Sequence, residues 1–376
     1  MLVTKSISRV AAGAALALIV FVNSRAADVP VKDPGAGPIS TGMSACLMAN
    51  QLHRGPPCPE PKPAADDASV SERLAALLAR ATYFADMQQF GKGLAETDAA
   101  LAIDPNDVKA LHLAARFSLS LGDIDRAERD IILARKRVPT DAAVNTTYAM
   151  VLLARHATTE AFKVLQSVVV SHPDFIYARE QRAAIRILWG ELQSARPEYE
   201  AALADYNFII ERSPPSARLF AMRARVFLVL DRPDSAAADL SAAVKLEPAS
   251  FALLAERASA YMQTGLDELA VQDLNEVLGT TGGSPVYVMM RDDRAKLLSK
   301  RARAYTHLHR FEDAARDAVA AVSLGGTAAI LRMQVFLRRN GFPEAPLDGK
   351  DSSALREAIS ACFGLNACSQ GLMQAI

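Results

Sequence analysis

The sequence predicts an all-α protein, most of which is a helical solenoid of about seven helix–turn–helix units, followed by a small three-helix C-terminal domain. Three observations predict it. Prolines recur at a spacing of 34 residues, small residues recur in register with them, and aromatic residues make up only 6% of the 376 residues. An interior of Ala, Leu and Val suits closely packed helices better than a β-sandwich, whose strands favour aromatic and β-branched residues.

Residues 1–26 are expected to be a secretory signal peptide. Lys5 and Arg9 precede an apolar run over residues 10–22, and Ser24 and Ala26 place small residues where a signal peptidase reads the chain. This run is shorter than the about 20 residues that a permanent transmembrane helix needs. We therefore expect a periplasmic protein with no permanent membrane span after cleavage, and an uncleaved N-terminal anchor is the alternative.

Residues 27–70 are expected to form a proline-rich linker. Eight of the 19 prolines fall within residues 30–63, a density that favours an extended, poorly packed tether. Cys46 and Cys58 lie in this linker, and Cys362 and Cys368 lie near the C-terminus. In an oxidising compartment the two local pairs are expected to form two short disulfide loops, although two other pairings are formally open.

Residues 71–326 carry the 34-residue period. Pro105, Pro139 and Pro173 are 34 residues apart, as are Pro214 and Pro248. At one equivalent position every unit has alanine: Ala81, Ala115, Ala149, Ala183, Ala224, Ala258 and Ala302. A second small position holds Gly93, Ala127, Ala161, Ala202, Ala236, Ala270 and Ala314. Antiparallel helices approach closely only where their facing residues are small, so these positions predict the seams of stacked helix pairs.

This pattern resembles the tetratricopeptide repeat, a 34-residue helix–turn–helix unit with small residues at positions 8, 20 and 27 and proline at position 32. The resemblance implies a superhelix whose concave side, lined by the first helix of each unit, holds a segment of a partner. Unit four departs from the pattern, because Arg186 replaces a large apolar residue and seven extra residues precede Ala202. These residues are expected to lengthen the two helices by two turns in all. Extra residues around 279–285 are expected to form a flexible loop.

Basic side chains are expected on the concave side when the sequence is placed in the register of this family. They are Lys109, His112 and Arg116 in unit two, Arg218 and Arg225 in unit five, and Lys296 and Arg303 in unit seven. Guanidinium groups so placed favour carboxylates, such as a C-terminus or an acidic segment of a partner. The alternative is that these residues are ordinary solvated charges on helices.

Residues 327–376 resemble the small three-helix peptidoglycan-binding domain. The residues that carry this resemblance are Gln334, Leu337, Gly341, Phe342, Asp348 and Gly349. Ser352 replaces the second glycine of the family, and Leu355 replaces its threonine. The alternative is a degenerate capping module that shields the open end of the solenoid.

No residue pattern indicates catalysis, a metal site or a cofactor. The six histidines include no metal-ligand spacing, and His307 and His309, two residues apart, point to different faces of a helix. Lys plus Arg and Asp plus Glu both number 42, so the basic surplus typical of nucleic-acid binders is missing.

The sequence therefore favours an exported, non-enzymatic scaffold that binds another envelope protein or peptide and is tethered to peptidoglycan through its C-terminal domain. Two alternatives stay open. One is a cell-envelope enzyme or enzyme accessory that acts on peptidoglycan or is targeted to it. The other is a wall binder whose repeats serve only as a spacer.

Overall fold

The computed structural model describes residues 59–279, 291–365, 368–369 and 371–372, and these residues form sixteen α-helices and no strand. Contacts divide the chain into two compact bodies, one ending at Asp205 and the other beginning at Tyr206. The predicted signal peptide, the Cys46–Cys58 pair and all but the first residue of the 279–285 loop lie outside the described residues.

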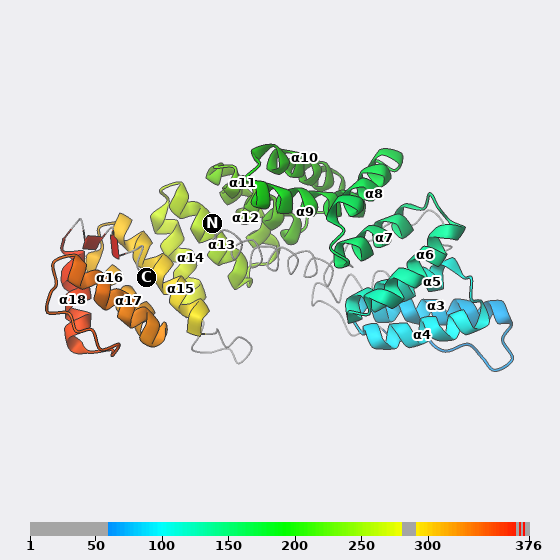
Figure 1. Ribbon diagram of the computed structural model, residues 1–376, viewed down its shortest axis with the longest axis horizontal. Coiled ribbons are helices and arrows are strands. Elements are labelled where there is room, and N and C mark those ends of the chain that lie inside the picture. Colours follow the sequence, from blue (N-terminus) through cyan, green and yellow to red (C-terminus); the bar gives the residue numbers. More distant parts are fainter. Residues whose placement is uncertain (1–58, 280–290, 366–367, 370, 373–376) are drawn as a thin grey trace. The chain divides into compact units, whose positions relative to one another are not determined.

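Consecutive helices form antiparallel hairpins in each body (Figure 1). The first body contains α3 (Val70–Asp86), α4 (Phe90–Ile103), α5 (Val108–Leu121), α6 (Ile124–Arg137), α7 (Ala142–Ala154), α8 (Thr158–Ser171) and α9 (Ile176–Gln193). The body boundary falls inside α10 (Arg196–Arg212). The second body continues with α11 (Ala217–Val229), α12 (Pro233–Leu246), α13 (Phe251–Gln263), α14 (Asp267–Gly279), α15 (Arg291–His307) and α16 (Phe311–Leu324). The seven helix pairs α3/α4 to α15/α16 confirm the predicted tetratricopeptide-like architecture.

The recurring small residues lie at the seams between helices, as predicted. All seven alanines of the first-helix position and all six alanines of the second-helix position are fully buried. Within each body a second helix also contacts the first helix of the following unit, as α4 contacts α5 and α12 contacts α13. A larger side chain at these positions would separate the helix axes, because interiors of this kind have no spare volume.

The turn within each unit requires a left-handed backbone at one equivalent residue. The positive φ angles are found at Gln88, Gly122, His156, Ser194, Asp231, Gly265 and His309. Only two of the seven residues are glycine, the residue that adopts this conformation without steric cost. His156 and His309 therefore act as turn residues in the fold.

In units one, five, six and seven an ion pair joins the two helices at residues 16 apart. Arg80 pairs with Glu96, Arg223 with Asp239, Arg257 with Asp273, and Arg301 with Asp317. In unit four the insertion moves the acceptor, and Arg182 pairs with Asp205 instead. These arginines lie one residue before the buried alanine of the first helix, so each guanidinium reaches across the seam that the alanine creates.

Unit four has longer helices, as the seven extra residues predicted. α9 has 18 residues and α10 has 17, whereas the helices of unit five have 13 and 14. Arg186, which replaces the expected apolar residue, donates from Nη1 to Asp205 Oδ2 at 2.9 Å and lies over the Phe162 ring. Burial lowers the pKa of Arg186, although the Asp205 carboxylate opposes this shift. The carboxylate of Asp205 thus makes a charged side chain tolerable at this position.

The C-terminal segment packs directly on the last helix pair. α17 (Gly326–Arg339) and α18 (Ser353–Phe363) both contact α16. One hydrophobic cluster contains Ala302 and Ala318 of unit seven together with Met333, Leu337 and Phe363. Beyond α18 the backbone is again helical at 368–369 and 371–372. The segment therefore covers the end of unit seven, in agreement with the capping alternative.

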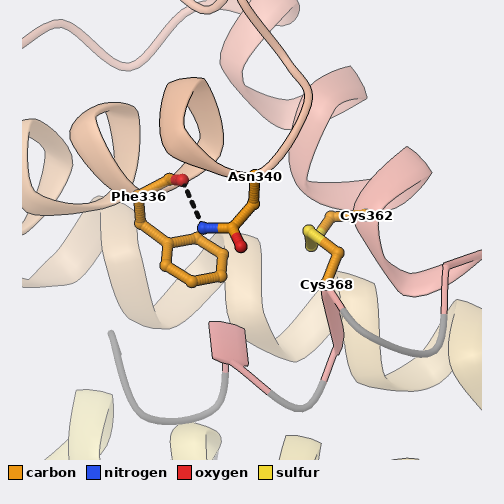
Figure 2. The surroundings of a disulfide bond; sticks show 4 residues. All are labelled: Phe336, Asn340, Cys362 and Cys368. Atoms are coloured by element: carbon orange, nitrogen blue, oxygen red, sulfur yellow. Dashed lines mark hydrogen bonds between the residues drawn. A yellow bond between two sulfur atoms is a disulfide. The ribbon is translucent and has the colours of Figure 1, made fainter.

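The predicted Cys362–Cys368 disulfide is present. It joins the end of α18 to the residues that follow, close to Phe336 of α17 and to Asn340, the C-cap of that helix (Figure 2). Both cysteines belong to the buried cluster shared with unit seven. Among the described residues, no helix has the length and apolar character needed to cross a membrane.

Candidate functional site

The strongest candidate for a binding site is a polar face on the first helices of units five, six and seven, which are α11, α13 and α15. Arg225 of α11 donates from Nε and Nη2 to the two carboxylate oxygens of Glu256 on α13, at 3.1 and 2.6 Å. The Glu256 carboxylate raises the pKa of Arg225. The Arg225 side chain is 47% exposed, and the edge of its guanidinium that suits a carboxylate is occupied by Glu256.

Lys300 extends this face onto α15. Its Nζ donates to Ser259 Oγ of α13 at 2.8 Å, and Ser259 donates in turn to the carbonyl of Ala255. Burial lowers the pKa of Lys300, and the nearby Glu256 carboxylate opposes this shift. Arg303, one turn further along α15, is exposed and close enough to Lys300 to lower its pKa as well.

The other predicted residues of the second body lie at the start of these helices. Arg218 is on α11, two turns before Arg225, and is partly buried. Lys296 is 74% exposed on α15, and its Nζ lies 3.6 Å from a carboxylate oxygen of Asp293. We name Arg218, Arg225, Lys296, Lys300 and Arg303, with Glu256 and Ser259, the first-helix face of the second body.

In the first body, the three predicted residues all lie on α5. His112 Nε2 is 2.9 Å from Thr147 Oγ1 on α7. Burial, together with the positive charge of Arg116, lowers the pKa of His112 to about 3. His112 is therefore neutral at physiological pH and contributes a hydrogen bond between units rather than a positive charge. Lys109 and Arg116 are exposed.

The residues of the C-terminal motif come together around Gln334. This fully buried side chain accepts from the Gly349 N–H at 3.0 Å and donates to Asp348 Oδ1 at 2.9 Å. The Lys350 N–H and the Gln334 amide hold the pKa of Asp348 below its usual range. Leu337 is fully buried, Phe342 packs against the same cluster, and Gly341 has a φ of +96°. These contacts give the motif a structural role, because they fix the loop between α17 and α18.

The departure at Ser352 also has a structural reason. Ser352 is the N-cap of α18, and its side chain accepts from the Leu355 N–H at 3.2 Å. Leu355 is buried in the cluster shared with unit seven. A glycine and a threonine at these positions would give up a side-chain cap and apolar burial.

The described residues contain no group of three His, Cys, Asp or Glu side chains that could hold a metal ion. His307, predicted to face away from His309, bonds through Nδ1 to Asp267 Oδ1 at 2.9 Å. This pair joins α15 to the start of α14. The His307–Asp267 pair is therefore a structural contact between units six and seven.

Glu256, Ser259 and Lys300 were not predicted from the sequence. All three lie on the first helices of units six and seven, but only a few cations of units two, five and seven were placed in the family register. A search of α13 for polar side chains on the same face would have found Glu256 and Ser259. Their contacts with Arg225 and Lys300 span 31 and 41 residues, a separation that no local pattern encodes.

No protein-family model matches the chain, and the search of curated proteins gives no significant match. Among solved structures, the chain is similar to a thermophilic TPR protein of Thermus thermophilus, with 20% identity over 50% of this chain and 99% of that one and a TM-score of 0.42. It is also similar to the C-terminal part of a TPR repeat-containing protein from Cytophaga hutchinsonii, with 15% identity, 66% and 95% coverage and a TM-score of 0.49.

A third similar structure is PilW, described as a widely conserved type IV pilus biogenesis factor. Its identity is 16%, its coverage is 56% of this chain and 95% of that one, and its TM-score is 0.48. The tetratricopeptide-like assignment itself rests on the seven helix pairs, the buried alanines and the recurring turn of this chain.

Proposed function

We propose that this chain is a non-enzymatic scaffold of the cell envelope that binds an acidic segment of a partner protein on the first-helix face of the second body. The partner segment is a C-terminus or a short run of acidic side chains. It lies along α11, α13 and α15 and is held by guanidinium and ammonium groups.

The observation that carries this proposal is the charge of the first-helix face. The face gathers five basic side chains; Glu256 pairs with Arg225, and Asp293 lies 3.6 Å from Lys296. Glu256 already occupies Arg225 in the bidentate geometry that a partner carboxylate would use. An acidic ligand complements the positive charge of the face, whereas a basic segment would be repelled.

A peptide-binding experiment tests this proposal. Fluorescence anisotropy would compare an acidic 12-residue peptide that has a free C-terminus with its amidated Asn/Gln counterpart. We expect the acidic peptide to bind at least about tenfold more tightly, and Lys296→Glu with Arg303→Glu to remove that preference. Equal affinities for the two peptides would exclude an acidic partner segment.

The chain offers a matched control for the charge reversal. Arg316 on α16 is as exposed as Lys296, at 74%, and like Lys296 it pairs with an aspartate three residues earlier. It lies on a second helix, away from the first-helix face. Arg316→Glu should leave peptide affinity unchanged, and an equal loss with this variant would mean that only the net charge matters.

We further propose export to the periplasm and attachment to peptidoglycan as the finer parts of this function. Export is supported by the order of charges, apolar run and small residues in residues 1–26. N-terminal sequencing of the protein from a periplasmic fraction tests it, and a sequence that starts near residue 27 is the expected result. Recovery with an intact N-terminus in the membrane fraction would favour the anchor.

A second candidate is a peptidoglycan-directed enzyme or accessory, and its support is the sequence resemblance of residues 327–376 to the peptidoglycan-binding domain. Incubation of the full chain with isolated peptidoglycan sacculi distinguishes the readings. Co-sedimentation alone supports attachment, and release of soluble muropeptides supports an enzyme. A chain that stays in the supernatant and releases nothing leaves the C-terminal segment with its capping role alone.

A further inference from the structure

Three of the arginines that join the helices of a unit also bind the preceding unit, each through Nη1. Nη1 of Arg182 donates to Gln166 Oε1 at 2.8 Å, and Nη1 of Arg223 donates to Asn207 Oδ1 at 2.9 Å. Nη1 of Arg301 donates to Asn275 Oδ1 at 2.8 Å. In each case Nε is directed to an aspartate on the second helix of the arginine's own unit. Nη1 thus points toward the second helix of the preceding unit, which supplies a side-chain amide oxygen as the acceptor. We call the position of this oxygen the acceptor slot.

In unit one the acceptor for this nitrogen has a different source, because no helix pair precedes the unit in the described residues. Arg80 occupies the equivalent position, and its Nε and Nη2 bond to Glu96 at 2.9 and 2.8 Å. Its Nη1 donates to the Pro61 carbonyl at 3.1 Å and to Glu60 Oε1 at 2.9 Å. The linker end therefore supplies the acceptors that a preceding unit supplies to Arg182, Arg223 and Arg301.

We propose that residues 59–63 are an N-terminal strap, an extended segment that closes the open end of the first body by filling the acceptor slot of Arg80. A repeat array needs such closure, because its terminal unit otherwise exposes a surface shaped for a neighbouring unit. The strap differs from the C-terminal closure, in which α17 and α18 bury a hydrophobic cluster against unit seven.

The composition of the strap suits this role. Pro59, Pro61 and Pro63 have no backbone N–H and a fixed φ, so the segment stays extended and loses little conformational entropy on docking. The Nη1 of Arg80 meets two acceptors from adjacent residues, the Glu60 carboxylate and the Pro61 carbonyl. The position of the carbonyl does not depend on side-chain charge. The proline density predicts an extended tether for this linker, and it gives no indication of the contacts that Glu60 and Pro61 make with Arg80.

Hydrogen exchange measured by mass spectrometry on the full chain tests the strap. Glu60→Ala should speed amide exchange in α3 about two- to fivefold, the range expected for a partly exposed ion pair. Lys62→Ala is the control, since Lys62 is an exposed neighbour in the same segment, and it should leave exchange in α3 unchanged. Replacement of residues 60–62 by Gly-Ser-Gly should give a larger effect that is confined to unit one.

A second measurement distinguishes the contribution of the strap from that of the Arg80–Glu96 pair within unit one. Arg80→Lys removes the fork that reaches both the strap and Glu96, so the effects of Arg80→Lys and Glu60→Ala should be less than additive in exchange rate. Equal exchange of α3 in the Glu60→Ala, Lys62→Ala and Gly-Ser-Gly variants would overturn the proposal. So would additive effects of Arg80→Lys and Glu60→Ala.

Discussion

Arg223 and Asp239 are joined by two parallel hydrogen bonds of 2.7 Å, from Nε to Oδ2 and from Nη2 to Oδ1, which tie α11 to α12. The carboxylate is buried, and the guanidinium lies near the Phe227 ring of its own helix. The relationship recurs at Arg257 with Asp273 and at Arg301 with Asp317. The ion pair is therefore a repeated part of the helix hairpin rather than a feature of one surface.

Removal of this carboxylate is expected to be costly. Asp239→Asn leaves the Arg223 guanidinium partly buried without a counter-charge, and we expect a loss of about 2–4 kcal/mol in the free energy of unfolding. Urea denaturation measures it. The control is Asp234→Asn, an exposed acid in the first turn of the same helix, with an expected loss below about 0.5 kcal/mol. Similar losses of unfolding free energy for the two variants would show that the Arg223–Asp239 ion pair contributes little to stability.

Replacing either of two glycines of α4 by alanine should change the stability of the protein, in opposite directions for the two positions. A Cβ on Gly93 would lie 2.5 Å from Phe117 Cζ, whereas a Cβ on Gly91 would have no atom within 4 Å. Gly91→Ala should stabilise the protein by about 0.5–1 kcal/mol through helix propensity. Gly93→Ala should destabilise it by about 1–3 kcal/mol because the core is overpacked. Thermal unfolding of the two variants provides the comparison, and stabilisation by Gly93→Ala would contradict the packing of Phe117.

The left-handed turn predicts a further pair of opposite effects. Gly122 has a φ of +83° with open space around the position of its Cβ, so Gly122→Ala should cost about 1 kcal/mol through backbone strain alone. His156, at the equivalent turn, has a φ of +63°. His156→Gly relieves strain and should raise the free energy of unfolding by up to about 1 kcal/mol. Chemical denaturation measures both variants, and a loss of stability in His156→Gly would show that its side chain makes a stabilising contact.

The lowered pKa of His112 predicts a loss of stability in acid. Its folded-state pKa of about 3 lies below the value of 6.5 for a free histidine, so the unfolded chain binds the proton first as the pH falls. The contribution of His112 is fully present above about pH 6.5 and declines as the pH falls toward 3, by up to about 1.4 kcal/mol per pH unit. His112→Gln should flatten the pH dependence of the free energy of unfolding between about pH 7 and pH 4.5.

The control for this prediction is His156→Asn, which changes an exposed histidine and keeps a residue that tolerates the left-handed turn. It should retain the wild-type slope. A His112→Gln variant with that same slope would mean that His112 is protonated in the folded protein.

The repeat architecture could be predicted from the sequence because its signals are local and repeated. The 34-residue spacing, the alanines in register and the length of the unit-four insertion each correspond to a feature of the helix hairpins. The disulfide between Cys362 and Cys368 could also be predicted, since the two cysteines are only six positions apart. For the candidate site, the register assigned basic residues to first helices, where α5, α11 and α15 carry them, but it did not give their partners.

What the sequence alone determined is that the chain forms helix pairs of about 34 residues and which small residues lie at the seams. Only the tertiary structure decided which acceptor each charged group meets: Glu256 for Arg225, Ser259 for Lys300, and the strap for the Nη1 of Arg80. Helical periodicity assigns a side chain to a face, but a hydrogen bond depends on distance and direction across two helices. Those quantities are set only when the hairpins pack against one another.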